Sequence, residues 1–280
     1  MPKIHANDLE QLLTLIEEET SSEKILRDRL KTKIADKHLH LPKRVLQESI
    51  AVTGILATPR RGNLGKMIVL TGLDKSGKET QAFNPDKNPR ITSVYDYLLS
   101  RSHRVLKILL PSYDTTFGSI IAAYLGKENS SVQIIGELPK EVAWILWSLD
   151  RAQHVPEIER WLSTDPFNVV LSKRWTETNL VYQRTNGIEH ERILKLERNV
   201  IKQTHTFVID VSLEVVFKRM RASGENPDKY ETRELLKKVH ENYIHLKKYY
   251  PFGQMFHFDG SGSLEEVNQK LLQELGKLGF

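Results

Sequence analysis

The segment most informative about the fold is Leu70-Thr71-Gly72-Leu73-Asp74-Lys75-Ser76-Gly77-Lys78-Glu79-Thr80. It follows an apolar run, Met67 to Leu70, that is typical of a buried strand. Gly72 and Gly77-Lys78 have the spacing of the loop G-x-x-x-x-G-K-[ST], in which backbone N–H groups turn toward phosphate oxygens and the lysine adds a cation. We therefore predict that Gly72 to Thr80 bind a polyphosphate; an ordinary glycine-rich turn is the alternative.

Glu79 departs from this loop pattern, because the position normally carries a hydroxyl group that binds Mg²⁺. A carboxylate beside a polyphosphate is repelled unless a cation lies between the two. Glu79 is therefore expected either to bind the metal itself or to pair with a cationic side chain nearby.

Composition limits the class of protein. The 280 residues can bury one large core with a small appendage, and 39% apolar with 28% charged residues is ordinary for a globular protein. No apolar run approaches the roughly 20 residues that span a bilayer, and no hydrophobic signal region opens the chain. The absence of cysteine excludes disulfides and thiol chemistry. We expect a cytoplasmic protein without a membrane or nucleic-acid partner, whose net charge of +5 suits small anionic substrates.

Residues 1–60 are predicted to form an N-terminal helical extension, followed by the main domain at 61–280. Apolar residues recur at helical spacing from Leu9 to Ile16 and again from Ile25 to Ile34, where Ser21 or Ser22 can cap the second helix. Residues 43–52 resume the pattern, and residues 57–63 read as a linker. The apolar faces of this extension require a partner, either the main domain or another subunit.

The main domain alternates short apolar runs with helical patterns, which predicts a parallel sheet covered by helices. The predicted strands are Met67–Thr71, Val105–Leu110, Asn168–Ser172, Thr206–Val211 and Met255–Phe258. The predicted helices are Ile91–Arg101, Thr116–Leu125, Lys140–Leu162, Leu213–Met220, Thr232–Tyr249 and Leu264–Leu278. Pro85 and Pro89 should end the helix behind the loop after about one turn. Ligands of such sheets bind beyond the carboxyl ends of the strands.

Five further segments follow these strands in an order that, with the loop at Gly72–Gln81, resembles the thymidylate kinase family of P-loop nucleoside monophosphate kinases. The segments are Leu110–Gly118, Trp147–Arg151, Lys173–Trp175, Asp210–Ser212 and Arg219–Glu231. The resemblance covers about residues 66–275. It implies an α/β, three-layer P-loop NTPase fold with a five-stranded parallel sheet of order 2-3-1-4-5. It also implies ATP and Mg²⁺ as cofactors and a homodimer.

The resemblance assigns roles around the phosphates. Lys78 would bridge the β- and γ-phosphates of ATP, and Asp74 would accept a hydrogen bond from the sugar of the acceptor nucleotide. Lys75 would stabilise charge on the transferred phosphoryl group. Arg219 and Arg221 would close over the triphosphate as part of a flexible lid, with Arg221 counted among the catalytic cations. The alternatives are a surface or loop lysine, a turn aspartate and solvated arginines.

The resemblance also assigns an acceptor site. Arg174 would clasp the monophosphate bidentately. Trp147 would stack on the base, and Arg151 would hydrogen-bond the edge of the base. Tyr113 and Tyr182 would line the same pocket. The alternatives are a structural ion pair for Arg174, a core position for Trp147 and packing for the tyrosines.

Lys173 is a second departure, because the family carries an aspartate before the arginine. Positions 79 and 173 should lie close together, since the first and third strands are neighbours in the expected sheet. One position has gained an acid and the other a base. We expect either a Glu79–Lys173 ion pair or Glu79 as a ligand of Mg²⁺, with Lys173 in contact with phosphate oxygens as a catalytic cation.

These observations favour an ATP-dependent nucleoside monophosphate kinase with dTMP as the preferred acceptor. Two alternatives stay open: a kinase of the same fold for another deoxynucleotide, and a nucleotide-binding regulatory protein that has lost phosphoryl transfer. The altered loop supports the last of these, whereas Lys78, Arg151 and Arg174 argue against it.

Overall fold

The computed structural model describes residues 1–20, 27–37, 39–60, 65–128, 130–223 and 232–280. The predicted cap residues Ser21 and Ser22 and most of the predicted lid, residues 224–231, lie outside this part of the chain. No helix within it is both long and apolar enough to cross a membrane.

The chain forms two compact units. Residues 63–109, 157–181 and 202–280 make up the first, which carries the large sheet and is called the sheet unit below. Residues 1–62, 110–156 and 182–201 make up the second, the helical unit. Helices α9 (Val155–Thr164) and α10 (Thr176–Thr185) contribute residues to both.

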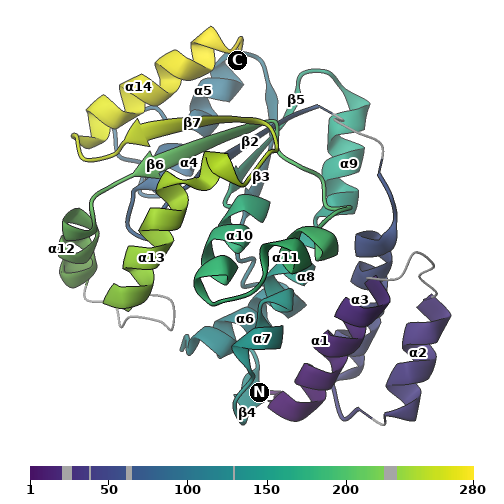
Figure 1. Cartoon of the computed structure of the whole chain (residues 1–280). Coiled ribbons are helices and arrows are strands. Elements are labelled where there is room, and N and C mark those ends of the chain that lie inside the picture. The colour runs from purple at the N-terminus through teal and green to yellow at the C-terminus, as the bar shows by residue number, and fades with distance from the viewer. Residues whose placement is uncertain (21–26, 38, 61–64, 129, 224–231) are drawn as a thin grey trace. The chain divides into compact units, whose positions relative to one another are not determined.

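The sheet unit is built on five parallel strands in the order β3-β5-β2-β6-β7 (Figure 1). Their bounds are β2 (Lys66–Thr71), β3 (Arg104–Leu109), β5 (Asn168–Lys173), β6 (His205–Asp210) and β7 (Gln254–Asp259). Counted along the chain, this is the predicted order 2-3-1-4-5. The central strands are buried on both faces, which explains why they read as continuous apolar runs.

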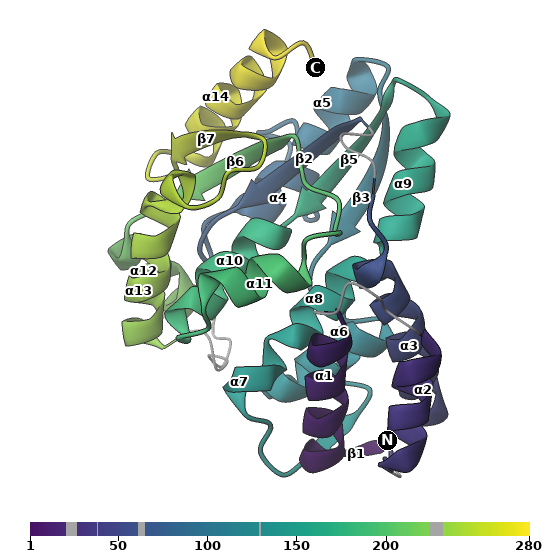
Figure 2. The same cartoon turned by 45° about the vertical axis from the view of Figure 1, so that its right-hand side comes forward.

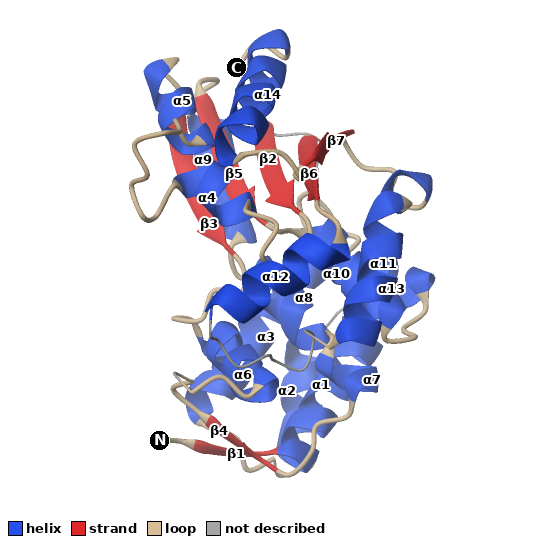
Figure 3. Cartoon of the chain, turned by 90° about the vertical axis from the view of Figure 1, so that its left-hand side faces the viewer, coloured by secondary structure: helices blue, strands red, loops and turns tan. Residues whose placement is uncertain are grey.

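Helices α4 (Lys78–Phe83), α5 (Val94–Ser100) and α14 (Leu264–Lys277) pack with the sheet around one apolar core (Figure 3). This core includes Leu70 from β2, Val94 from α5 and Leu271 from α14. The predicted interruption is present, since α4 ends at Phe83 and Asn84 adopts a left-handed conformation. The remaining helices of this unit are α12 (Leu213–Ser223), α13 (Arg233–Ile244) and the 3₁₀ turn η1 (Leu246–Lys248).

The helical unit contains the N-terminal extension together with later parts of the chain. Its elements are β1 (Lys3–His5), α1 (Ala6–Thr20), α2 (Arg27–Asp36), α3 (Lys43–Ala57), α6 (Thr116–Leu125), β4 (Gln133–Ile135), α7 (Lys140–Ala143), α8 (Ile145–Ala152) and α11 (His190–Leu196). Figure 2 shows α1, α2 and α3 side by side. Strand β1 pairs in parallel with β4, a small sheet that the sequence analysis did not predict (Figure 3).

The apolar face of the extension is covered by helices of the main domain. Leu12, Leu13 and Ile16 of α1 are fully or almost fully buried. Helix α1 packs on α7 and α8, and α3 packs on α6 and α8. Of the two partners expected for this face, the structure therefore has the one supplied by the same chain.

Candidate nucleotide site

The loop between β2 and α4 has the backbone geometry of an anion site. A Cβ on Gly72 would lie 2.4 Å from the carbonyl oxygen of Ile209, so only glycine lets the chain leave β2 this close to β6. Gly77 caps α4 at φ 89° without a side-chain hydrogen bond, and the first N–H groups of a helix have no acceptor within it. The Oγ of Ser76 is buried and finds no hydrogen-bond partner among the described residues. Donors in this loop are therefore available for a ligand.

Lys78 is buried behind this loop. Its Nζ donates to the carbonyl oxygen of Leu73 at 2.8 Å and lies 3.5 Å from Oδ1 of Asp74. Burial, followed by the positive charge of Arg174, lowers the pKa of Lys78 to about 7. An anion in the loop would supply the countercharge that the buried ammonium needs.

Arg174 meets Asp74 at the end of β5. The backbone of Arg174 is left-handed at φ 67°, and it is held because its N–H donates to Leu70 while its carbonyl oxygen accepts from Ser172 Oγ. The guanidinium bonds Oδ1 of Asp74. Two residues predicted for the acceptor thus lie together beside the phosphate loop, joined in an ion pair.

Glu79 and Lys173 also pair. The Nζ of Lys173 donates to Oε2 of Glu79 at 2.6 Å, as expected from the register that places Lys173 beside Leu70 of β2. The Lys173 side chain is 17% exposed and that of Glu79 is 44% exposed. Burial and the neighbouring Arg174 lower the pKa of Lys173, whereas Glu79 raises it. Of the two alternatives for Glu79, the ion pair is the one present.

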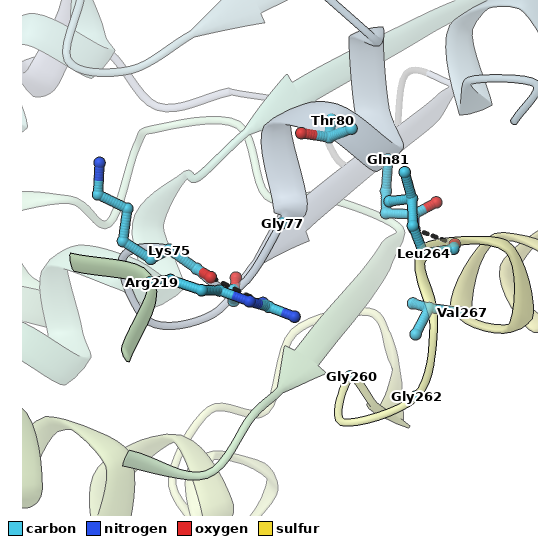
Figure 4. Close-up of a pocket in the computed structure, with 10 residues that line it drawn as sticks. Lys75, Gly77, Thr80, Gln81, Arg219, Gly260, Gly262, Leu264 and Val267 are labelled. Carbon is cyan, nitrogen blue, oxygen red and sulfur yellow. Dashed lines mark hydrogen bonds between the residues drawn. The ribbon is translucent and has the colours of Figure 1, made fainter. Parts of the chain in front are cut away.

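A cavity of about 370 Å³ adjoins the loop (Figure 4). Residues of the loop and of α4 line one side, and Gly260 and Gly262 between β7 and α14 line the other. Arg219 of α12 also lines it and donates from Nη1 to the carbonyl oxygen of Lys75 at 2.8 Å. Lys75 itself has φ 60°, so its carbonyl faces this arginine through a left-handed turn.

Arg221, which the sequence analysis grouped with the catalytic cations, is not brought to the loop. It lines a separate cavity of about 720 Å³ with Phe217 of α12 and Arg233 of α13. Residues two apart on a helix point about 200° from each other. Because Arg219 faces the loop, Arg221 faces away from it.

The residues predicted to bind the acceptor base belong to the helical unit. Trp147 of α8 is half-buried and meets Tyr124 edge to face at 5.7 Å between ring centroids. Tyr182 is buried, whereas Tyr113 is 37% exposed. This leaves Trp147 with a partly accessible ring, unlike the fully buried Trp144 and Trp175.

Arg151 is held by Glu197, a residue that the sequence analysis missed. Nε and Nη2 of Arg151 both bond Oε1 of Glu197, and Ser148 Oγ donates to the same oxygen at 2.7 Å. All three side chains are buried. Glu197 directly follows α11 and belongs to no motif, so nothing in the sequence distinguishes it from the neighbouring acids Glu189 and Glu191.

Asp150 organises the segment that follows β3. Its carboxylate accepts hydrogen bonds from the N–H of Ser112 at 3.1 Å and from Gln153 at 2.7 Å. Burial raises the pKa of Asp150 to about 7. Ser112 Oγ lies 2.8 Å from Nε2 of His154, so α8 and the residues just after it both contact the turn at Ser112.

Comparison with known proteins identifies the family of the chain. A model of the thymidylate kinase family matches residues 70–271. The chain belongs to the thymidylate kinase family. A probable thymidylate kinase of Thermococcus kodakarensis is 27% identical over 206 residues, which span 73% of this chain and 94% of the relative. A thymidylate kinase of Sulfurihydrogenibium sp. is 28% identical and is covered to 97% by 76% of this chain.

The fold also matches a solved structure, that of thymidylate kinase from Candida albicans, with a TM-score of 0.56 and 21% identity. The match covers 77% of this chain and 92% of that one. The family model begins at residue 70, so the extension lies outside it.

Mg²⁺, which the thymidylate kinase family implies, does not fit the residues present in the usual way. The hydroxyl expected at position 79 is a carboxylate that Lys173 already neutralises at 2.6 Å. The carboxylate expected at position 173 is an ammonium group. Within the described residues, no group of three His, Cys, Asp or Glu side chains could hold a metal ion. A divalent ion would therefore have to rely on oxygens of the nucleotide and on water.

Proposed function

We propose that this protein is an ATP-dependent nucleoside monophosphate kinase that phosphorylates dTMP to dTDP. Membership of the thymidylate kinase family supports this proposal, and the relatives named above carry the same activity in their names. The observation that carries it is the buried Lys78 behind a loop of open N–H donors, with Arg174 and Asp74 beside it.

The phosphates of ATP would lie in the loop between β2 and α4. Loop N–H groups and Lys78 would hold them, and the 370 Å³ cavity next to the loop has room for the nucleoside of the donor. Arg219, which lines that cavity, would add positive charge over the phosphates. The chain's residues would act by orientation and by charge, without a covalent intermediate.

Arg174 of the sheet unit would bind the phosphate of the acceptor. In this arrangement Asp74 holds the guanidinium of Arg174 at the loop before the substrate arrives. Trp147 would stack on the base. Arg151 would present an edge of its guanidinium fixed by Glu197, so Glu197 would act as a positioning residue for base recognition. We also propose that the protein is a homodimer, as the family implies. Light scattering would then give twice the 32.4 kDa of one chain.

A coupled assay of ADP release against a panel of nucleoside monophosphates tests the proposal. Turnover should be highest with dTMP and should fall at least 100-fold in Lys78→Met, because one charge-assisted contact at a transferring phosphate contributes several kcal/mol. The matched control is Lys277→Met, which removes an exposed lysine of α14 and should leave the rate unchanged.

Three results would contradict the proposal in different ways. Preference for another monophosphate would contradict dTMP as the acceptor but would still support a nucleoside monophosphate kinase. No turnover with any acceptor, despite binding of ATP, would indicate a nucleotide-binding protein without transfer. A Lys78→Met variant as active as the wild type would show that the loop between β2 and α4 does not take part in the reaction.

A further inference from the structure

The charges at positions 79 and 173 have a consequence for how the triphosphate is bound. We infer that the Glu79–Lys173 ion pair replaces the contact that a phosphate loop normally makes with a divalent ion, so that this protein binds a nucleoside triphosphate with similar affinity with and without that ion. The inference rests on the proposed function, in which ATP is the donor.

The pair is built into the sheet unit rather than formed by two mobile surface side chains. Position 79 lies in the first turn of α4, which starts directly after the loop, and Lys173 is the last residue of β5. Parallel pairing of β2 with β5 sets Lys173 opposite Leu70. Lys173 is largely buried, and its Nζ is 2.6 Å from Oε2 of Glu79. The backbone therefore fixes the positions from which the two side chains extend toward each other.

A metal ion gains no ligand from the protein at this point. Lys173 occupies Oε2 of Glu79, so an ion at the other carboxylate oxygen would lie beside the ammonium group of Lys173 and close to the adjacent residue Arg174. Burial lowers the pKa of Lys78, Arg174 and Lys173 lower it further, and Asp74 raises it, so an ion here would meet two more cations besides Lys78. Like charges at such distances repel by several kcal/mol in a partly buried site. The protein therefore makes no direct contact with a metal ion that would favour the metal-bound nucleotide over the metal-free one.

The metal-free triphosphate finds compensating charge in the protein instead. Lys78, Lys173 and Arg174 surround the loop, and their acidic partners are Asp74 and Glu79. The N-terminal N–H groups of α4 add partial positive charge. Binding free energies are reciprocal. If the metal does not alter the protein's affinity for the nucleotide, the protein does not alter the nucleotide's affinity for the metal.

Calorimetric titration of the full chain with a non-hydrolysable ATP analogue, in excess EDTA and in excess Mg²⁺, tests the inference. The two dissociation constants should agree within about threefold. The comparison variant is the double substitution Glu79→Thr with Lys173→Asp, which restores a hydroxyl and a carboxylate. It should bind at least about tenfold more tightly with Mg²⁺ than in EDTA.

A second measurement needs no variant. Electron paramagnetic resonance gives the affinity of Mn²⁺ for the analogue alone and for the analogue bound to the wild-type protein, and the two affinities should agree within about threefold. Wild-type binding that weakens tenfold or more in EDTA, or Mn²⁺ held tenfold more tightly in the complex, would overturn the inference and leave the kinase proposal intact. Absence of binding in both buffers would overturn the proposed function and the inference with it.

Discussion

At the scale of single residues, Lys78 shows how burial and function oppose each other. A lysine whose pKa is lowered to about 7 by burial and by Arg174 is only partly charged in the ligand-free protein at neutral pH. A bound polyphosphate favours the charged form, so binding should take up a proton above pH 7. The contribution of Lys78 to nucleotide affinity is therefore complete below about pH 7 and is lost as the pH rises.

We therefore expect affinity for the ATP analogue to fall between pH 7 and pH 9 in the wild type, by about tenfold in all. Lys78→Met should bind more weakly at pH 7 and should lack this decline, so the difference between the two proteins isolates the lysine from titration of the nucleotide. Calorimetry in buffers of different ionisation enthalpy counts the protons taken up. A wild-type curve parallel to that of Lys78→Met would show that Lys78 is fully charged throughout.

Residue-level prediction from the sequence succeeded where partners lie on neighbouring strands. Positions 79 and 173 could be paired in advance, because a parallel sheet with the expected order brings β2 and β5 together. Glu197 could not be assigned to Arg151, because the two are 46 residues apart and meet only when α8 and α11 pack. Arg219 and Arg221 could not be ranked, since the rotation of α12 about its axis is set by tertiary packing.

At the scale of elements, the start of α6 depends on a close approach of two backbones. A Cβ on Gly118 would lie 1.8 Å from the carbonyl oxygen of Ser112, although the φ of this glycine is ordinary. Asp150 holds the same turn through the N–H of Ser112, so the turn has little freedom to move. The requirement for glycine here is steric rather than conformational.

Gly118→Ala should accordingly lower the free energy of unfolding by more than about 3 kcal/mol, because backbone atoms must separate to admit the methyl group. Gly276→Ala in α14 is the matched control: its Cβ would meet the side-chain hydroxyl of Tyr97 at 3.2 Å and no backbone atom of another segment, and alanine favours a helix over glycine. Urea denaturation measures both variants. Equal stabilities for the two would refute the steric account.

The sequence predicted the strands of the large sheet well and some helix boundaries poorly. Buried parallel strands can be recognised in the sequence as apolar runs, and all five lie within one or two residues of their predicted bounds. The predicted helix at 140–162 is instead three helices. Trp144 and Gln153, where it breaks, keep helical dihedral angles, so the apolar spacing continues across each break. Strand β1 has three residues and exists through its pairing with β4, which lies 130 residues away in the chain.

At the scale of the whole molecule, the extension is part of a shared core. Leu13 of α1 is fully buried, α1 packs on α7 and α8 of the main domain, and Arg192 of α11 forms two hydrogen bonds with Glu17 at 2.7 and 2.8 Å. Asn199 donates to the carbonyl oxygen of Leu56 at 2.8 Å. The extension therefore holds the segment that carries Glu197, the partner of Arg151.

Leu13→Ala should lower the free energy of unfolding by about 2–5 kcal/mol, the usual cost of a cavity in a closely packed core. Thr14→Ala, at the exposed neighbouring position, should change it by less than about 0.5 kcal/mol.

Removal of residues 1–57 should expose the faces of α6 and α8 that α3 covers and should cause self-association, seen by light scattering. A truncated protein that stays monodisperse and as stable as the full chain would show that the extension is an independent appendage.

The strands of the parallel sheet, the loop proposed to bind phosphate and the opposite charges at Glu79 and Lys173 could be recognised from the residues alone, because they are encoded by apolar runs and by residues close in sequence. The strand order was expected from the family resemblance, and the structure has it. The folded structure was needed for the partner of Arg151, the position of Arg219 rather than Arg221 beside the loop, the lowered pKa of Lys78 and the surface that covers the extension. These depend on desolvation and on contacts between distant segments, which exist only once the helices have packed.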